Sequence, residues 1–223
     1  MLIKPMYLLA DSQLLFWKET ERSMLQRVRA DIESAVPAAA YIGASNGDIP
    51  EYFSLFQGAM EQIEVSNCRM VPSKPTQEDK AFVEQADLLL LAGGEVELGW
   101  RVFEENGLKE IIARRRMEGA VIIGISAGAV QIGMGWLTEA AVMKKLDTFR
   151  FVPFYVSAHE EQEEWWNLRA LVNLASENGR GIGIPAGGGA IYYSDGVLEP
   201  LRKPLVEFVK LENEVVEHLL MPQ

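Results

Sequence analysis

Short, largely apolar segments alternate along this chain with longer amphipathic ones, and the alternation restricts the folds open to it. Amphipathic stretches over about 17–36, 51–64, 77–86 and 97–118 predict helices. Between them lie five candidate strands, MYLLA (6–10), AAAYIGAS (38–45), CRMVPS (68–73), LLLLAGG (88–94) and AVIIGIS (120–126). Continuous apolar strands separated by helices are typical of a parallel sheet with helices on both faces. The pattern predicts an α/β fold with a doubly wound, mostly parallel sheet.

The last third of the chain has a different pattern. RFVPFYVSA (150–158) predicts a strand, and residues 160–179 predict one long helix that ends at Gly179. GIGIPAG, GAIYYSDG and PLVEFVKL then predict strands joined by tight turns, with Asp195 and Gly196 as the turn of a hairpin. We expect an antiparallel hairpin near the C terminus. Because no repeat or linker divides the chain, residues 1–223 are predicted to form a single domain.

Composition and charge exclude several classes of partner. The net charge of −11, from 32 acidic and 21 basic residues, would repel phosphate backbones, so we expect no nucleic acid. No segment approaches the roughly 18 apolar residues of a membrane span, so we expect no membrane. MLIKPMYLLADSQ is interrupted too early, by Pro5 and Asp11, to resemble a signal peptide. Since Cys68 is the only cysteine and no disulfide is needed, we expect a cytoplasmic protein.

Cofactor and metal motifs are absent from the sequence. Neither G-x-G-x-x-G nor G-x-x-x-x-G-K-[ST] occurs, which gives no indication of a nucleotide cofactor. Two histidines and one cysteine, without an HExxH pattern, offer few ligands for zinc. We therefore expect neither a cofactor nor a metal.

A candidate nucleophile stands at the end of the strand AVIIGIS. Gly124, Ser126 and Gly128 satisfy G-x-S-x-G, in which a serine occupies a strained turn between a strand and a helix. The following AGAVQIGMG can begin a helix whose free N–H groups favour an oxyanion. The alternative is a tight turn in which the serine only caps the helix.

Two further strand ends carry residues that suit the same chemistry. A serine nucleophile usually needs a histidine base, and His159 follows the strand FVPFYVSA, whereas His218 lies in a charged, helix-like stretch near the C terminus. The turn at Gly93 and Gly94 ends the strand LLLLA, so its N–H groups are candidate oxyanion donors. The alternatives are a histidine that caps the next helix and a simple turn.

AGGE, GISAGA and FVPFYVSAH together resemble peptidase family S51, the family of dipeptidase E and cyanophycinase. The resemblance runs from AYIGASNGD to GGGAIYYSDG, and GxSAGA is its most specific element. It implies a class I glutamine amidotransferase-like three-layer sandwich and a serine hydrolase. It also implies that Ser126 is the nucleophile and His159 the base, with Gly94 and Ala127 as the oxyanion hole.

The third catalytic residue is not fixed by any motif. Family members carry an acid between the serine and the histidine, and here LTEAAVMKKLDTFR offers Glu139 and Asp147. Glu139 is the first choice because its distance before the histidine is nearest to that of the dipeptidase acid. Either residue can equally be a solvated loop carboxylate.

This sequence departs from the family pattern in ways that affect specificity. Glu95 stands where the family usually has asparagine, which places a carboxylate beside the oxyanion site. The EEQEE that follows His159 is either an acidic first helical turn or the wall of a pocket for an amino group. The cations that could recognise an aspartyl substrate are Arg150, Arg169 and Arg180, and no motif selects among them. We do not expect strict aspartyl-dipeptidase specificity.

The function predicted from these residues is a serine peptidase that hydrolyses small or unusual peptides, of the dipeptide or isopeptide class, through an acyl-enzyme. Two alternatives stay open. One is an α/β-hydrolase-type esterase, which would use His218 rather than His159. The other is a non-catalytic binding protein on the same fold. The expected partner is a small peptide substrate, and a homodimer is left open.

Overall fold

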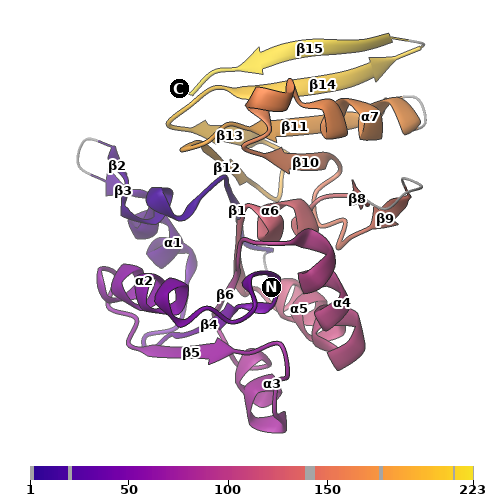
Figure 1. Ribbon diagram of the computed structural model, residues 1–223. Helices are drawn as coiled ribbons and strands as arrows, with labels where there is room; N and C mark the ends of the chain where they lie inside the picture. The colour runs from indigo at the N-terminus through magenta and orange to yellow at the C-terminus, as the bar shows by residue number, and fades with distance from the viewer. Residues whose placement is uncertain (1–2, 20–21, 139–143, 176–177, 213, 223) are drawn as a thin grey trace.

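The chain forms a central seven-stranded sheet, seen in a computed structural model that describes residues 3–19, 22–138, 144–175, 178–212 and 214–222 (Figure 1). The strand order is β13-β12-β1-β7-β6-β4-β5. β1, β7, β6, β4 and β5 run parallel, and β12 and β13 are antiparallel to their neighbours. Their bounds are Met6–Leu9 (β1), Ala38–Ile42 (β4), Asn67–Val71 (β5), Leu88–Leu91 (β6), Val121–Ile125 (β7), Gly189–Tyr192 (β12) and Leu198–Leu201 (β13). The predicted fold class and the hairpin at YYSDGVLEP are confirmed.

Helices cover both faces of this sheet, because successive strand residues point to opposite sides. Met6 and Leu8 of β1 lie in one core, and Tyr7 and Leu9 lie in the other. Figure 1 shows α1 (Met24–Asp31) and α2 (Pro50–Glu61) on one side, with α4 (Val96–Asn106) and α5 (Leu108–Met117) on the other. The first core also packs against α3 (Gln77–Val83) and α6 (Ala127–Ile132). Within the described residues, no helix is long and apolar enough to cross a membrane.

A second sheet of four strands lies beside the first, in the order β10-β11-β14-β15. Its strands are β10 (Tyr155–Ala158), β11 (Arg180–Ile184), β14 (Leu205–Leu211) and β15 (Glu214–Leu220). Val156 and Ile182 face the core of the central sheet, whereas Tyr155 and Phe208 pack under α7 (Trp166–Leu174). One hydrophobic core is therefore shared by the two sheets.

Two predicted helices are shorter or broken in the structure. The helix expected over 17–36 is confined to α1, preceded by a 3-10 turn, η1 (Ser12–Phe16), and the paired strands β2 (Lys18–Glu19) and β3 (Arg22–Ser23). The helix begins late because Ser23 and Gln26 form a capping box. The helix expected over 97–118 is two helices, because Gly107 adopts φ 70° and ends α4.

The segment after His159 also differs from the prediction. Instead of one helix over 160–179, a 3-10 turn, η3 (Glu161–Glu163), is followed by Trp165 in the left-handed region, and α7 then runs only to Leu174. The stretch around His218 is not helical but forms strand β15, in which His218 pairs with Glu207 of β14. β15 is an edge strand of its sheet, and its residues EVVEHLL are exposed or only partly buried.

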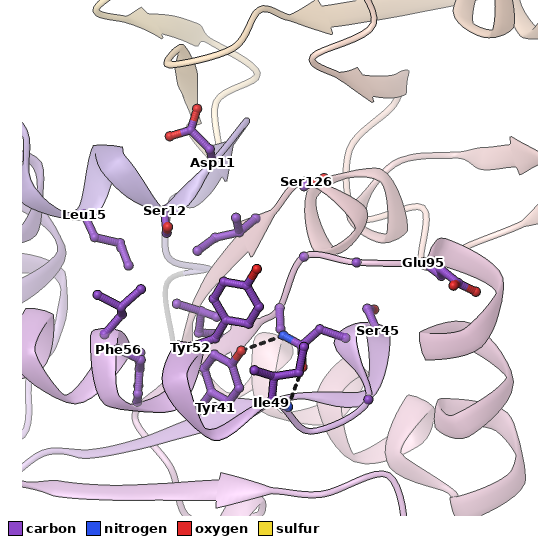
Figure 2. A pocket seen from close by; sticks show the side chains of 18 of the residues that line it. Asp11, Ser12, Leu15, Tyr41, Ser45, Ile49, Tyr52, Phe56, Glu95 and Ser126 are labelled. Atoms are coloured by element: carbon purple, nitrogen blue, oxygen red, sulfur yellow. Dashed lines mark hydrogen bonds between the residues drawn. The ribbon is translucent and has the colours of Figure 1, made fainter.

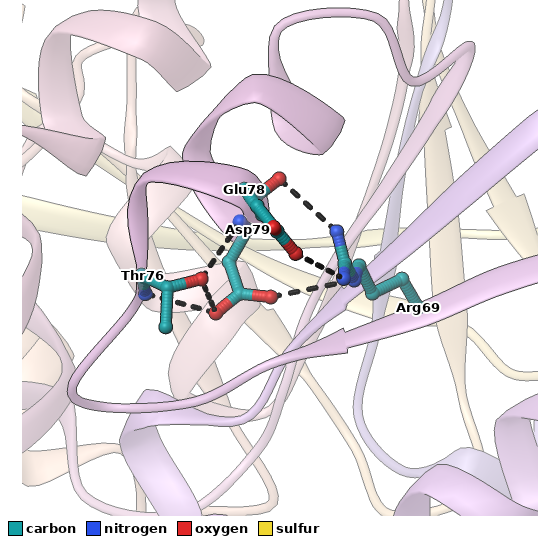
Figure 3. A network of polar contacts seen from close by, with 4 residues as sticks. All are labelled: Arg69, Thr76, Glu78 and Asp79. Carbon is teal, nitrogen blue, oxygen red and sulfur yellow. Dashed lines mark hydrogen bonds and ion pairs between the residues drawn. The ribbon is translucent and has the colours of Figure 1, made fainter.

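A polar network fixes α3 to the edge of the central sheet (Figure 3). Thr76 and Asp79 form the capping box of α3, with the Asp79 carboxylate accepting from the Thr76 amide at 2.9 Å. Arg69 of β5 reaches the same carboxylate at 3.3 Å and donates to the Glu78 carbonyl at 3.1 Å. The arginine thus ties the start of the helix to the neighbouring strand.

Candidate active site

Ser126 occupies a strained turn between β7 and α6. Its backbone lies at φ 49° and ψ −110°, which is sparsely populated by non-glycine residues. The turn is held because the Ser126 amide donates to the Leu9 carbonyl at 2.8 Å, and its own carbonyl accepts from Val130 at 3.0 Å. Such a turn presents the serine hydroxyl at the carboxyl ends of the parallel strands.

The glycines around Ser126 allow this turn to form. A Cβ on Gly124 would lie 2.6 Å from the Gly128 carbonyl oxygen, and a Cβ on Gly128 would lie 2.1 Å from the Leu91 oxygen. Real Cβ atoms essentially never approach other atoms this closely. The G-x-S-x-G spacing therefore reflects two tight backbone contacts, one between β7 and α6 and one between α6 and β6.

His159 lies beside Ser126, as the strand ends predicted. The Ser126 Oγ and the His159 Nε2 are 2.7 Å apart, within hydrogen-bond distance. His159 comes from the second sheet, immediately after β10, with φ 48° and its amide donating to the Ile184 carbonyl at 2.8 Å. The other histidine, His218, lies exposed on β15. The geometry required of a nucleophile and its base is thus present.

Glu160 anchors the loop that carries His159. Its side chain is buried, and one carboxylate oxygen accepts from the Ser157 hydroxyl at 2.7 Å while the other accepts from the Asn167 amide at 2.7 Å. Its carbonyl accepts from the Trp165 amide at 3.1 Å. The buried Glu160 thus holds the residue next to His159 in place. The sequence EEQEE gave no sign that its first glutamate is buried while the others are exposed.

The two amides predicted to form an oxyanion hole are free to bind a ligand. Within the described residues, neither the Gly94 nor the Ala127 N–H donates to a protein acceptor. Ala127 is the first residue of α6, where amides lack an intrahelical partner. Gly94, at φ 129°, follows β6, and Gly94 and Ser126 line the same two cavities. A Cβ on the adjacent Gly93 would lie 3.3 Å from the serine Cβ. The arrangement suits an oxyanion.

A buried side-chain contact supports the Gly94 turn from below. Gln131 of α6 is fully buried and donates to the Ser45 hydroxyl and to the Val96 carbonyl, both at 3.1 Å. The Ser45 carbonyl in turn accepts from the Glu95 amide at 2.7 Å. Sequence reasoning missed Gln131, and the only signal was a polar residue inside the apolar AGAVQI.

Among the residues that the structure describes, His159 is not paired with an acid. Glu139, the first choice, lies outside the described residues. Asp147 is exposed on β9 (Lys145–Asp147), which pairs with β8 (Gly135–Leu137), and its nearest cation is Lys145 at 3.8 Å. Within the described part of the chain, the one hydrogen bond of the His159 ring joins it to Ser126. The role of either acid stays a prediction.

Two cavities meet at Ser126 and His159, and Figure 2 shows residues that line the first of them. The first, of about 540 Å³, is mostly apolar and lies over the carboxyl ends of β1, β4, β6 and β7. The second, of about 640 Å³, is bordered by Glu95, Glu97, Glu160 and Glu163. Both volumes fall in the range of small-molecule sites. Substrate can therefore extend to either side of the serine.

The charge of this crevice is negative. No lysine or arginine is among the described residues that line either cavity. Arg169 pairs with Glu217 at 2.6 Å and Arg180 pairs with Glu207 at 2.5 Å, both away from the serine, and Arg150 borders neither cavity. In Figure 2 the Glu95 carboxylate points away from Ser126. Glu95 thus leaves the oxyanion position free of direct contact.

Among the described residues, no three or more His, Cys, Asp or Glu side chains are grouped so that they could hold a metal ion. The chemistry available at the site is that of a hydroxyl, an imidazole and two amide donors.

The family model and the curated relative that match this chain are both described as peptidases. The family model described as Peptidase family S51 matches residues 7–199. The uncharacterized peptidase YgaJ of Bacillus subtilis (strain 168) is 27% identical over 95 residues, which are 42% of this chain and 41% of that relative. The match therefore spans less than half of the curated relative.

Solved structures share the fold. A peptidase from an acI-B1 Actinobacterium superposes with a TM-score of 0.74 at 16% identity, covering 99% of this chain and 95% of the other. A protein described as a peptidase E from Listeria monocytogenes EGD-e gives a TM-score of 0.65 at 14% identity, with 89% and 98% covered. At these identities the likeness concerns the fold alone.

Proposed function

Because this chain belongs to peptidase family S51, we propose that it is a serine peptidase that hydrolyses small peptides, of the dipeptide or isopeptide class, through an acyl-enzyme. The observation that carries the proposal is the 2.7 Å contact between the Ser126 Oγ and the His159 Nε2, made by a serine held in a strained strand-to-helix turn. The two free amides beside it supply the remaining catalytic element.

In the first half of the reaction, the Ser126 Oγ attacks the scissile carbonyl carbon while His159 Nε2 takes the hydroxyl proton. The carbonyl oxygen becomes negatively charged and accepts hydrogen bonds from the Gly94 and Ala127 amides. When the C–N bond breaks, the imidazolium returns the proton to the leaving amine. The acyl group is left as an ester on Ser126.

In the second half, water replaces the amine. His159 Nε2 removes a proton from the water as its oxygen attacks the ester carbonyl, and the same two amides hold the oxyanion. The Ser126 Oγ leaves with the proton from the histidine. The product is a carboxylic acid, and the enzyme returns to its starting state.

Labelling by a fluorophosphonate tests the nucleophile. We expect wild type to gain one phosphonyl group, with loss of fluoride from the probe, Ser126→Ala to gain none, and Ser54→Ala, an exposed serine of α2, to label like wild type. His159→Ala should slow labelling at least about 10³-fold, because the hydroxyl loses its base, whereas His218→Ala should not. Labelling of Ser126→Ala, or equal loss in both histidine variants, would overturn the proposal. Intact-mass spectrometry measures each result.

A peptide screen tests the reaction class. Wild type and Ser126→Ala are incubated with a library of dipeptides and isopeptides, including β-aspartyl and amino-terminal aspartyl members. We expect release of free amino acids by wild type only. Equal release by the variant would show that another protein or another residue is responsible.

A further inference from the structure

We propose that the first cavity receives a large apolar side chain from the acyl half of the substrate. The enzyme would then cleave after a bulky aliphatic or aromatic residue and would discriminate against an acidic one. The inference rests on the proposed function, because it takes Ser126 as the nucleophile.

Exposed apolar side chains gather on this cavity. Tyr52 is 47% exposed, Leu55 is 44% exposed and Ile49 is 40% exposed, and all three border the cavity that contains Ser126. Behind them lie Phe56 and Tyr41, which are almost fully buried. A group of exposed apolar side chains in a concave site marks a surface that is covered by a ligand.

Several polar side chains in the cavity wall already have hydrogen-bond partners within the protein. The Tyr41 hydroxyl accepts from the Asn46 amide group at 2.8 Å, and the Asn46 side-chain oxygen accepts from the Ile49 amide at 3.2 Å (Figure 2). The Asp11 carboxylate accepts from the Gly187 amide at 2.6 Å and from the Gln13 amide at 2.9 Å. Since these groups already have protein partners and much of the remaining lining is aliphatic or aromatic, the wall offers a ligand mainly apolar contact.

The position of the His159 loop assigns this cavity to the acyl side. Ala158 and Glu160, the neighbours of His159, line the second cavity but not the first. His159 must give its proton to the leaving amine, so the leaving group extends along its loop into the second cavity. The acyl group then extends the other way, over the strand ends and onto Tyr52 and Leu55.

Charge argues against an acidic substrate side chain. The described lining of the first cavity contains the carboxylates of Asp11 and Glu95 and no lysine or arginine. A carboxylate placed there would lose water without gaining a lysine or arginine partner, which is costly. A large apolar side chain, by contrast, displaces water from the exposed faces of Tyr52 and Leu55.

A set of phosphonate probes with one reactive group and different side chains tests this assignment. The probes carry hydrogen, methyl, benzyl or carboxymethyl in the acyl position, and the second-order labelling rate is measured for each. We expect benzyl to react at least about 10-fold faster than methyl and at least about 100-fold faster than carboxymethyl. Tyr52→Lys, which adds a cation to the cavity wall, should reduce the ratio of benzyl to carboxymethyl at least about 10-fold.

The matched control is Gln57→Lys, which makes the same charge change at an exposed position of α2 outside the cavity. It should leave the ratio at the wild-type value. Equal rates for benzyl and methyl, faster reaction of carboxymethyl in wild type, or an equal shift in both lysine variants would overturn the inference. If the hydrogen probe labels Ser126, the proposed function stands whatever the ratios are. If the hydrogen probe does not label Ser126, that result contradicts the proposed function itself, independently of the side-chain preference.

Discussion

Gly94→Ala should separate the contribution of the oxyanion turn from that of general stability. Gly94 has φ 129°, and a Cβ there would lie 2.0 Å from the Ser45 carbonyl oxygen. Real Cβ atoms essentially never lie within 3.0 Å of another non-bonded atom, so the Ser45 oxygen and the new Cβ must move apart by 1.0 Å. The same oxygen accepts the Glu95 amide at 2.7 Å, so the displacement breaks the contact that sets the turn.

The expected magnitudes follow from these distances. Backbone strain alone costs about 1–3 kcal/mol, which for a chain of this length lowers Tm by roughly 2–12 °C. Displacement of one oxyanion donor lowers kcat by about 10²–10³-fold. We therefore expect a folded protein with a moderate loss of Tm and a much larger loss of acylation rate.

The assay combines thermal denaturation by circular dichroism with the rate of fluorophosphonate labelling. Gly196→Ala is the control, because Gly196 has φ 91° in the β12–β13 turn and a Cβ there would meet nothing within 4 Å. It should lower Tm to a similar extent and leave labelling unchanged. If Gly94→Ala labels at the wild-type rate, the Gly94 amide does not hold the oxyanion.

Two further predictions concern residues that act on the site or on the fold from a distance. Glu160→Gln should slow labelling about 10-fold and lower the free energy of unfolding by about 1–3 kcal/mol. The two carboxylate oxygens accept from the Ser157 hydroxyl and from the Asn167 amide, whereas a glutamine side chain has only one oxygen to accept with. Glu164→Gln, four residues on and exposed, is its control. The pKa of Glu199 is lowered, since burial raises it but hydrogen bonds from Tyr193 and a neighbouring arginine outweigh burial. Its contribution to stability is therefore complete above the ordinary pKa and is lost as the pH falls through the folded-state pKa. Tyr193→Phe should cost about 1 kcal/mol in urea denaturation at pH 7, and the cost should fall as the pH is lowered through the folded-state pKa of Glu199; a cost that is the same at every acidic pH at which the protein stays folded would contradict the pairing.

The strands and the family could be predicted because their signals are local. Continuous apolar runs such as LLLL and VIIGI are typical of buried parallel strands, and the structure places them so. The resemblance to peptidase family S51 is confirmed by the match over residues 7–199. The predictions of one unbroken helix over 97–118 and one over 160–179 were wrong. In each segment a residue, Gly107 or Trp165, adopts a left-handed backbone conformation, which hydrophobic periodicity does not reveal.

The candidate site was predictable only where it depends on strand ends. Ser126, His159 and the turn at Gly94 each follow a strand, and the carboxyl ends of parallel strands meet at one edge. Gln131 and Glu160 look like ordinary polar residues in the sequence, and only their burial shows what they hold.

The apolar cavity could not have been predicted by the same reasoning. Leu15, Tyr41 and Tyr52 come from a 3-10 turn, a strand and a helix, three elements that are separate in the sequence. Only the tertiary arrangement shows that they share a cavity with Ser126.

The two residues that must touch in the proposed mechanism stand on different sheets. Ser126 follows β7 of the central sheet and His159 follows β10 of the second, and the shared core between them includes Ile122 and Val156. A 1 Å slip of one sheet over the other would separate the hydroxyl from the imidazole while every strand stayed intact. On heating, enzyme activity should therefore be lost at a lower temperature than the circular dichroism signal of the helices and strands. The loss of activity would then measure the packing between the two sheets and not the stability of either sheet.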